Sequence, residues 1–146
     1  MMDSFVAAQL PPQGFAGAVT DKGPNRRFNE DAVLLPGMIL GGSARQSWTA
    51  PLEQPANLVA VFDGMGGHGN GRLAAVTACT FLLDKVASGA CGSEGWLELA
   101  LQQMADYVTD VGALTQATSR MGATVAGLVV QQSTVSVFSV GDARVY

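Results

Sequence analysis

Residues 57–71, NLVAVFDGMGGHGNG, constrain the fold of this chain more than any other segment. An apolar run ends here in Asp63, and glycine fills five of the next eight positions. The run predicts a buried strand with a carboxylate at its end. Because glycine has no side chain, the backbone after Asp63 can turn tightly and come close to a ligand.

The same glycine-rich segment permits two other interpretations. Residues 64–69 fit the G-x-G-x-x-G spelling of a dinucleotide-binding loop, a helical pattern follows from Arg72, and Asp84 could take the ribose-binding role. However, Asp63 would repel a pyrophosphate unless a cation lay between them, and no further strand–helix–strand unit follows. We therefore favour a metal-binding loop, and a tight glycine turn without a ligand is the alternative.

A second acidic centre lies upstream, in residues 23–31, GPNRRFNED. Two arginines precede the adjacent carboxylates Glu30 and Asp31, and the apolar run 32–35 follows. Alone, this pattern is typical of a solvated turn. Together with Asp63, it offers carboxylate oxygens for a hard divalent cation and a guanidinium group for a phosphate. The two segments together predict a phosphoryl-transfer site.

Four motifs, in this order, resemble landmarks of the metal-dependent, type 2C (PPM) serine/threonine protein phosphatases. They are Arg26-x-x-x-Glu30-Asp31, Val61-Phe62-Asp63-Gly64-Met65-Gly66-Gly67-His68, Met121-Gly122-Ala123-Thr124 and Val140-Gly141-Asp142-Ala143-Arg144. The spelling of the second motif is similar to the bacterial branch of the family. The resemblance spans residues 14–146 and covers the N-terminal part of the family's domain.

The resemblance implies a binuclear centre of Mn²⁺ or Mg²⁺ that activates water for hydrolysis of phosphoserine and phosphothreonine. Asp63 would bridge the two ions, while the backbone carbonyl of Gly64 and the carboxylate of Glu30 would help to hold one of them. Asp31 would support bound water in the second shell of ligands. Asp142 matches an aspartate that in some members contacts a third, weaker metal.

For the substrate, the resemblance implies that Arg26 binds the phosphate of a phosphorylated protein, in opposition to a serine/threonine kinase. Arg27 is expected to be a solvent-facing neighbour. His68, the only histidine, is a candidate general acid for the leaving serine or threonine. Some family members place a histidine directly after the Asp-Gly pair, where this chain has Met65. A loop histidine bonded to backbone or water is therefore the alternative for His68.

Two further metal aspartates of the family, from later Asp-Gly and Asp-Asn motifs, have no match in residues 1–146. We therefore expect this chain to be truncated and, by itself, to show no appreciable phosphatase turnover. Two alternatives remain open: a catalytically dead module that binds a phosphoprotein or another partner, and an incomplete copy with no role of its own.

Composition agrees with a single soluble domain, since 48% of the 146 residues are hydrophobic. The net charge of -4 and the scattered basic residues argue against nucleic-acid binding. No apolar run is long enough to span a membrane, and the first residues lack the basic lead of a secretory signal, so we expect a cytoplasmic protein. Cys79 and Cys91 are expected to be reduced thiols.

Hydrophobic periodicity predicts an α+β fold. Strands are expected at 15–20, 32–35, 58–62, 124–130 and 134–140, with a long loop at 36–55 and a flexible arm at 1–13. One helix is expected to bury Leu73, Val76, Thr80, Leu83 and Ala87, and a second, after a Ser93 cap, to bury Leu97, Leu101, Met104, Val108 and Val111. The resemblance makes this part of a four-layer α-β-β-α sandwich of mainly antiparallel sheets.

Overall fold

The computed structural model describes residues 14–42, 44–53, 55–66, 70–89, 91, 95–115, 120–131 and 134–146, so the expected arm at 1–13 lies outside it. The described elements run in the order β1 (Gly14–Thr20), β2 (Asp31–Leu35), β3 (Met38–Leu40), β4 (Gln46–Leu52), β5 (Ala56–Met65), α1 (Asn70–Ala87), α2 (Trp96–Leu114), β6 (Gly122–Gln131) and β7 (Thr134–Val140).

The strands form two antiparallel sheets. The main sheet has the order β3-β2-β5-β6-β7, and the small sheet pairs β1 with β4. The two helices lie between β5 and β6 in the sequence, yet these strands are antiparallel neighbours. The described sheets therefore lack the parallel strand–helix–strand unit that a dinucleotide-binding fold requires.

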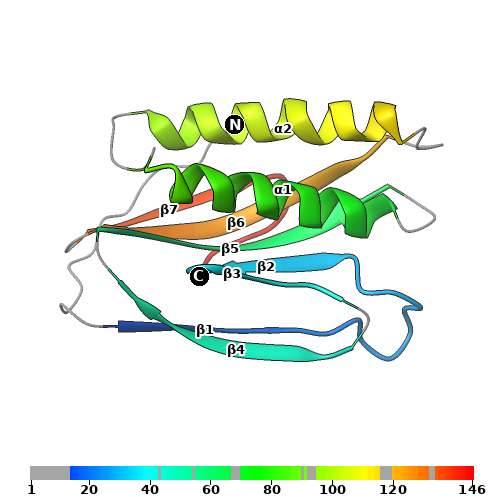
Figure 1. The fold of residues 1–146 in the computed structure, drawn as a ribbon. Helices are drawn as coiled ribbons and strands as arrows, with labels where there is room; N and C mark the ends of the chain where they lie inside the picture. The colour runs from blue at the N-terminus through cyan, green and yellow to red at the C-terminus, as the bar shows by residue number, and fades with distance from the viewer. Residues whose placement is uncertain are drawn as a thin grey trace.

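The elements stack in three layers (Figure 1). Both helices cover one face of the main sheet, and the small sheet lies against part of the opposite face. The larger core, between sheet and helices, is filled by side chains such as Phe62, Leu82 and Phe138. A smaller core, between the sheets, contains Val33, Leu35, Leu40 and Ala50. This arrangement confirms the α+β class and supplies three of the layers expected of an α-β-β-α sandwich.

The predicted loop at 36–55 is wrong, because it contains β3 and β4. Strand β4 buries only Ala50 fully, and Trp48 is half exposed, so β4 shows little of the hydrophobic pattern of a core strand. It also contains Pro51, which strands tolerate where its missing N–H faces no partner. The pairing with β1 makes this segment a strand. The five strands expected from periodicity are all present, as β1, β2, β5, β6 and β7.

The predicted core stripe of α1 is wrong in part, whereas that of α2 is largely confirmed. Of the predicted residues, Val76 and Leu83 are half-buried against the core, whereas Leu73, Thr80 and Ala87 are exposed. Apart from Leu82, the residues that α1 buries are small: Gly71, Ala74, Ala75, Ala78 and Cys79. Small residues let the helix axis lie close to the main sheet. Helix α2 buries the expected leucines, Met104 and Val108, and leaves Val111 half-buried. The expected cap Ser93 lies outside the described residues, and Gly95 occupies the N-cap position.

Neither helix in the described part of the chain is both long and apolar enough to cross a bilayer.

We predict that Phe62→Ala lowers the free energy of unfolding by about 3–5 kcal/mol, because it empties a fully buried aromatic site between β5 and the helices. Phe15→Ala is the matched control, since the Phe15 side chain is 74% exposed on β1. Urea denaturation followed by circular dichroism measures both changes. Similar losses in the two variants would contradict the assignment of the core.

Candidate metal and phosphate site

The candidate residues gather at one end of the main sheet, in a row that crosses its strands. Asp31 at the start of β2 pairs with Asp63 on β5, and Asp63 pairs with Thr124 on β6. Directly paired residues of antiparallel strands project from the same face of the sheet. The register therefore places both carboxylates and the threonine hydroxyl side by side, although Asp31 and Asp63 are 32 positions apart in the chain.

Asp31 and Asp63 form a close carboxylate pair. Burial raises the pKa of Asp31 above its ordinary value, and the charge of Asp63 and a hydrogen bond with its side chain raise the pKa further. Arg26 opposes this rise only in part. Repulsion between neighbouring carboxylates is relieved by a proton on Asp31 or by a cation bound between the two groups.

Asn29 fixes the start of β2 and was not singled out in the sequence. Its side chain is buried, donates from Nδ2 to the Thr20 hydroxyl at 2.8 Å, and accepts at Oδ1 from the Asp31 backbone N–H at 3.1 Å. These two bonds connect the end of β1 to the residue that bears the Asp31 carboxylate. The sequence carries a signal for it, because asparagine often bonds to the backbone two residues on.

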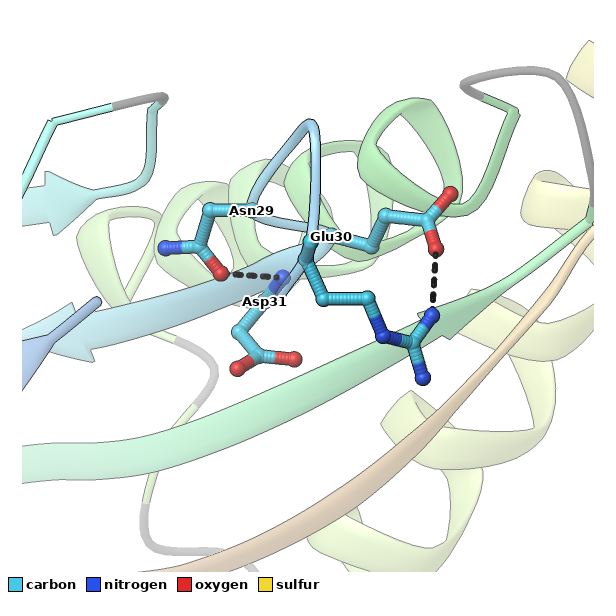
Figure 2. Close-up of polar contacts among 4 residues, drawn as sticks. Asn29, Glu30 and Asp31 are labelled. Carbon is cyan, nitrogen blue, oxygen red and sulfur yellow. Dashed lines mark hydrogen bonds and ion pairs between the residues drawn. The ribbon is translucent and has the colours of Figure 1, made fainter. Parts of the chain in front are cut away.

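Glu30 and Asp31 are adjacent but point in opposite directions (Figure 2). The Glu30 carboxylate forms an ion pair with Arg26 at 3.8 Å, and Arg26 is largely exposed at 77% of its side chain. The Glu30 side chain also lies beside the first turn of α1, since a Cβ built on Gly71 would come within 2.9 Å of the Glu30 Oε1. Glu30 thus points away from Asp31 but remains near enough for its charge to raise the pKa of Asp31 further, and its carbonyl accepts from the residue that follows Asp63.

Gly64 and Gly71 bring the end of β5 against the first turn of α1. A side chain on Gly64 would collide with the Gly71 carbonyl and would lie 2.8 Å from the Glu30 carbonyl. The Gly64 N–H donates to that same Glu30 carbonyl at 3.2 Å. Glycine is therefore required at both positions by close backbone approach, which explains part of the glycine-rich spelling after Asp63.

A polar cleft of about 290 Å³ opens beside the row. Its lining combines acidic, basic and amide side chains: Asp21, Lys22, Arg26, Phe28, Asn29, Glu30, Asp31 and Asp63. Arg27 is not among these lining residues, and its guanidinium stacks over the Phe28 ring at 5.1 Å. The two adjacent arginines therefore occupy different surroundings, and Arg26 is the one that faces the carboxylates.

The described residues fit part of a site for a hard cation. Magnesium commonly keeps several waters and takes only one or two protein carboxylates, a set that the Asp31–Asp63 pair can supply. No group of three or more metal-binding side chains comes together within the described ranges. Asp142 follows β7 at the same end of the sheet but lines a separate cavity of about 890 Å³ with the last residues of the chain. His68 lies outside the described residues.

The fold itself is that of known enzymes. The serine/threonine phosphatase PstP/Ppp of Mycobacterium tuberculosis superposes with a TM-score of 0.61 at 20% sequence identity, over 90% of this chain and 48% of its own. The PPM Ser-Thr phosphatase MsPP of Mycobacterium smegmatis, solved in complex with cacodylate, gives 0.60 at 26% identity, over 89% and 46%. This chain has the fold of the PPM-type serine/threonine phosphatases.

The resemblance to PPM phosphatases in four short motifs is thus matched by structure. The chain spans about half the length of these solved PPM phosphatases. No protein-family model matches the sequence, and no curated protein does. Three-dimensional comparison therefore finds a relationship that whole-sequence comparison does not.

We predict that Asp31→Asn stabilises the metal-free chain at neutral pH. A carboxyl group whose pKa is raised by folding makes the folded state lose stability as the pH rises through that pKa, and the amide escapes this loss. The melting temperature of the variant should exceed that of the wild type near pH 7, and the gap should close at or below pH 3.8, the ordinary value for Asp31.

Thermal melts between pH 3 and 7 with a chelator present test this prediction. Asp106→Asn, at an exposed position within α2, is the control for removal of one negative charge. If Asp31→Asn were less stable than the wild type at pH 7, the ionised Asp31 carboxylate would have favourable interactions in the fold without a cation, which contradicts the prediction.

Proposed function

We propose that this chain is a segment of a metal-dependent protein phosphatase domain that hydrolyses phosphoserine and phosphothreonine. The observation that carries the proposal is the Asp31–Asp63 carboxylate pair at one end of the main sheet, within a PPM phosphatase fold. The substrate would be a phosphorylated protein, the product of a serine/threonine kinase. Because the chain spans about half of the solved phosphatases, this activity is proposed for a domain that includes further segments.

Asp63 is the proposed central ligand for Mn²⁺ or Mg²⁺, with the Gly64 carbonyl and Glu30 contributing to one ion and Asp31 orienting bound water. The supporting observations are the contact between Asp31 and Asp63 and the short path from Asp63 to the Glu30 backbone through Gly64. When bound, such cations lower the pKa of a water molecule and neutralise charge on the phosphate. Asp142 and His68 remain proposals for a third metal and for a general acid.

Arg26 is the proposed phosphate ligand. Its only ion pair among the described residues is the 3.8 Å contact with Glu30, and the guanidinium is mostly exposed. Exposed pairs of this kind contribute little to stability, so a phosphate could replace Glu30 at small cost. MsPP was solved with cacodylate, a tetrahedral oxyanion, which supports an oxyanion site in this fold.

A binding module without catalysis is the second candidate function. It is favoured by the finding that no three metal-binding side chains meet within the described residues. Such a module would keep Arg26 and the polar cleft for a phosphorylated partner. Metal binding and phosphopeptide binding by the same chain distinguish the two functions, because only the phosphatase requires both.

We predict that Asp63→Asn weakens Mn²⁺ binding more than Asp31→Asn does. The first change removes the proposed bridging ligand, whereas loss of a second-shell partner typically costs about 10- to 100-fold in affinity. Titration of Mn²⁺ followed by electron paramagnetic resonance measures both, with Asp106→Asn as the control. Equal losses in the two variants would contradict the bridging role of Asp63.

We predict that Arg26→Ala mainly raises KM for a phosphopeptide in a domain that combines this chain with the remaining metal aspartates. Substrate and transition state both carry the phosphate charge, so most of the contact contributes equally to both. Arg27→Ala is the matched control, because Arg27 does not line the cleft and its guanidinium stacks over the Phe28 ring. A larger rise in KM from Arg27→Ala would indicate that Arg27, rather than Arg26, binds the phosphate.

A further inference from the structure

The loop of residues 21–30 joins β1 to β2 and carries Arg26 near its middle. Most of its side chains are exposed, and the Arg26 side chain is 77% exposed. The ion pair between Arg26 and Glu30 is long, at 3.8 Å, and an exposed pair of this kind restrains a side chain little. A guanidinium binds a phosphate best when its planar fork is held in one direction. The restraint on Arg26 therefore has to come from the backbone of the loop.

Lys22 is the side chain that braces this backbone. It is half-buried, whereas Asp21 before it and residues 24–28 after it are exposed. The Lys22 Nζ donates to the Arg26 carbonyl at 3.2 Å and to the Gly23 carbonyl at 3.3 Å. The Asp21 Oδ1 accepts from the Gly23 N–H at 2.9 Å, and Gly23 has φ of 69°, a left-handed conformation that favours glycine. These bonds close the loop into a compact turn that ends at Arg26.

The ammonium group of Lys22 is suited to this bracing role. An ammonium carries three N–H donors and no acceptor, so a single Nζ can serve two carbonyls at once. Hydrogen bonds from a charged donor are also stronger than those between neutral groups. Lys22 lines the same polar cleft of about 290 Å³ as Arg26. The residue that braces the loop thus borders the space in which a phosphate would bind.

We propose that Lys22 is a positioning residue for Arg26. Its hydrogen bond to the Arg26 carbonyl fixes the backbone from which the guanidinium extends, so less conformational freedom is lost when the guanidinium binds a phosphate. The ammonium group is engaged by two carbonyls and acts through Arg26 rather than on the phosphate. This inference rests on the proposed role of Arg26 as the phosphate ligand and adds to it a residue outside the four motifs.

A double-mutant cycle in the 146-residue chain separates positioning from direct binding. Lys22→Met removes the donor and its charge, so the Kd for inorganic phosphate in the presence of Mg²⁺ should rise by about 3- to 10-fold. In an Arg26→Ala background the same change should have no further effect, because no guanidinium is left to position. Lys85→Met, at the only other lysine, is the matched control for loss of a positive charge and should leave the Kd unchanged.

Amide chemical shifts followed by NMR measure phosphate binding, and thermal melts measure stability. Wild-type phosphate affinity in Lys22→Met would overturn the positioning role. A further loss of affinity when Lys22→Met is added to Arg26→Ala would also overturn it, because Lys22 would then bind the phosphate itself. A large fall in the melting temperature of Lys22→Met would assign the residue to the stability of the fold instead. Unchanged affinity in Arg26→Ala, or no binding by the wild type, would overturn the proposed phosphate site and the inference with it.

Discussion

The close approach of Gly64 to Gly71 is the constraint on which the rest of the site depends. A side chain at either position would collide with the backbone of the other segment, so the first turn of α1 can rest on the end of β5 only with glycine at both. The Gly64 N–H then reaches the Glu30 carbonyl and fastens the start of β2 to the same point. The start of β2, distant in sequence, thereby meets the junction of β5 and α1. This contact places Glu30 and Asp31 beside the end of β5.

The acidic row at this junction is unfavourable for the metal-free fold and informative about function. Burial and the charge of Asp63 raise the pKa of Asp31, and the buried Thr124 hydroxyl has no hydrogen-bond partner among the described residues. Elsewhere the hydrophobic pattern of the sequence agrees with the packing of the fold, as in the apolar strand β2 and on the core face of α2. Natural proteins commonly break such agreement at functional sites, where a ligand supplies the missing interaction. A divalent cation would relieve the repulsion between the two carboxylates.

Hydrophobic periodicity predicted the strands and helices whose large apolar side chains face a core. It failed for β4 and for the buried face of α1, which depend on contacts with other elements. Strand β4 buries one residue fully, so only its pairing with β1 identifies it as a strand. In α1 the larger side chains suggested the core face, but apart from Leu82 the helix fully buries only alanine, glycine and cysteine, which lets it lie close to the main sheet. The spacing of large apolar side chains therefore does not predict a helix face that packs through small residues.

The sequence by itself determined the α+β class, five of the strands, both helices and the two acidic segments, because these follow from local composition and spacing. It did not determine that Asp31 opposes Asp63, that Glu30 turns away to Arg26, or that Asn29 and Thr124 adjoin the carboxylates. Those facts depend on strand register and side-chain direction, which long-range pairing sets. Tertiary structure therefore decided which of the predicted site residues act as neighbours.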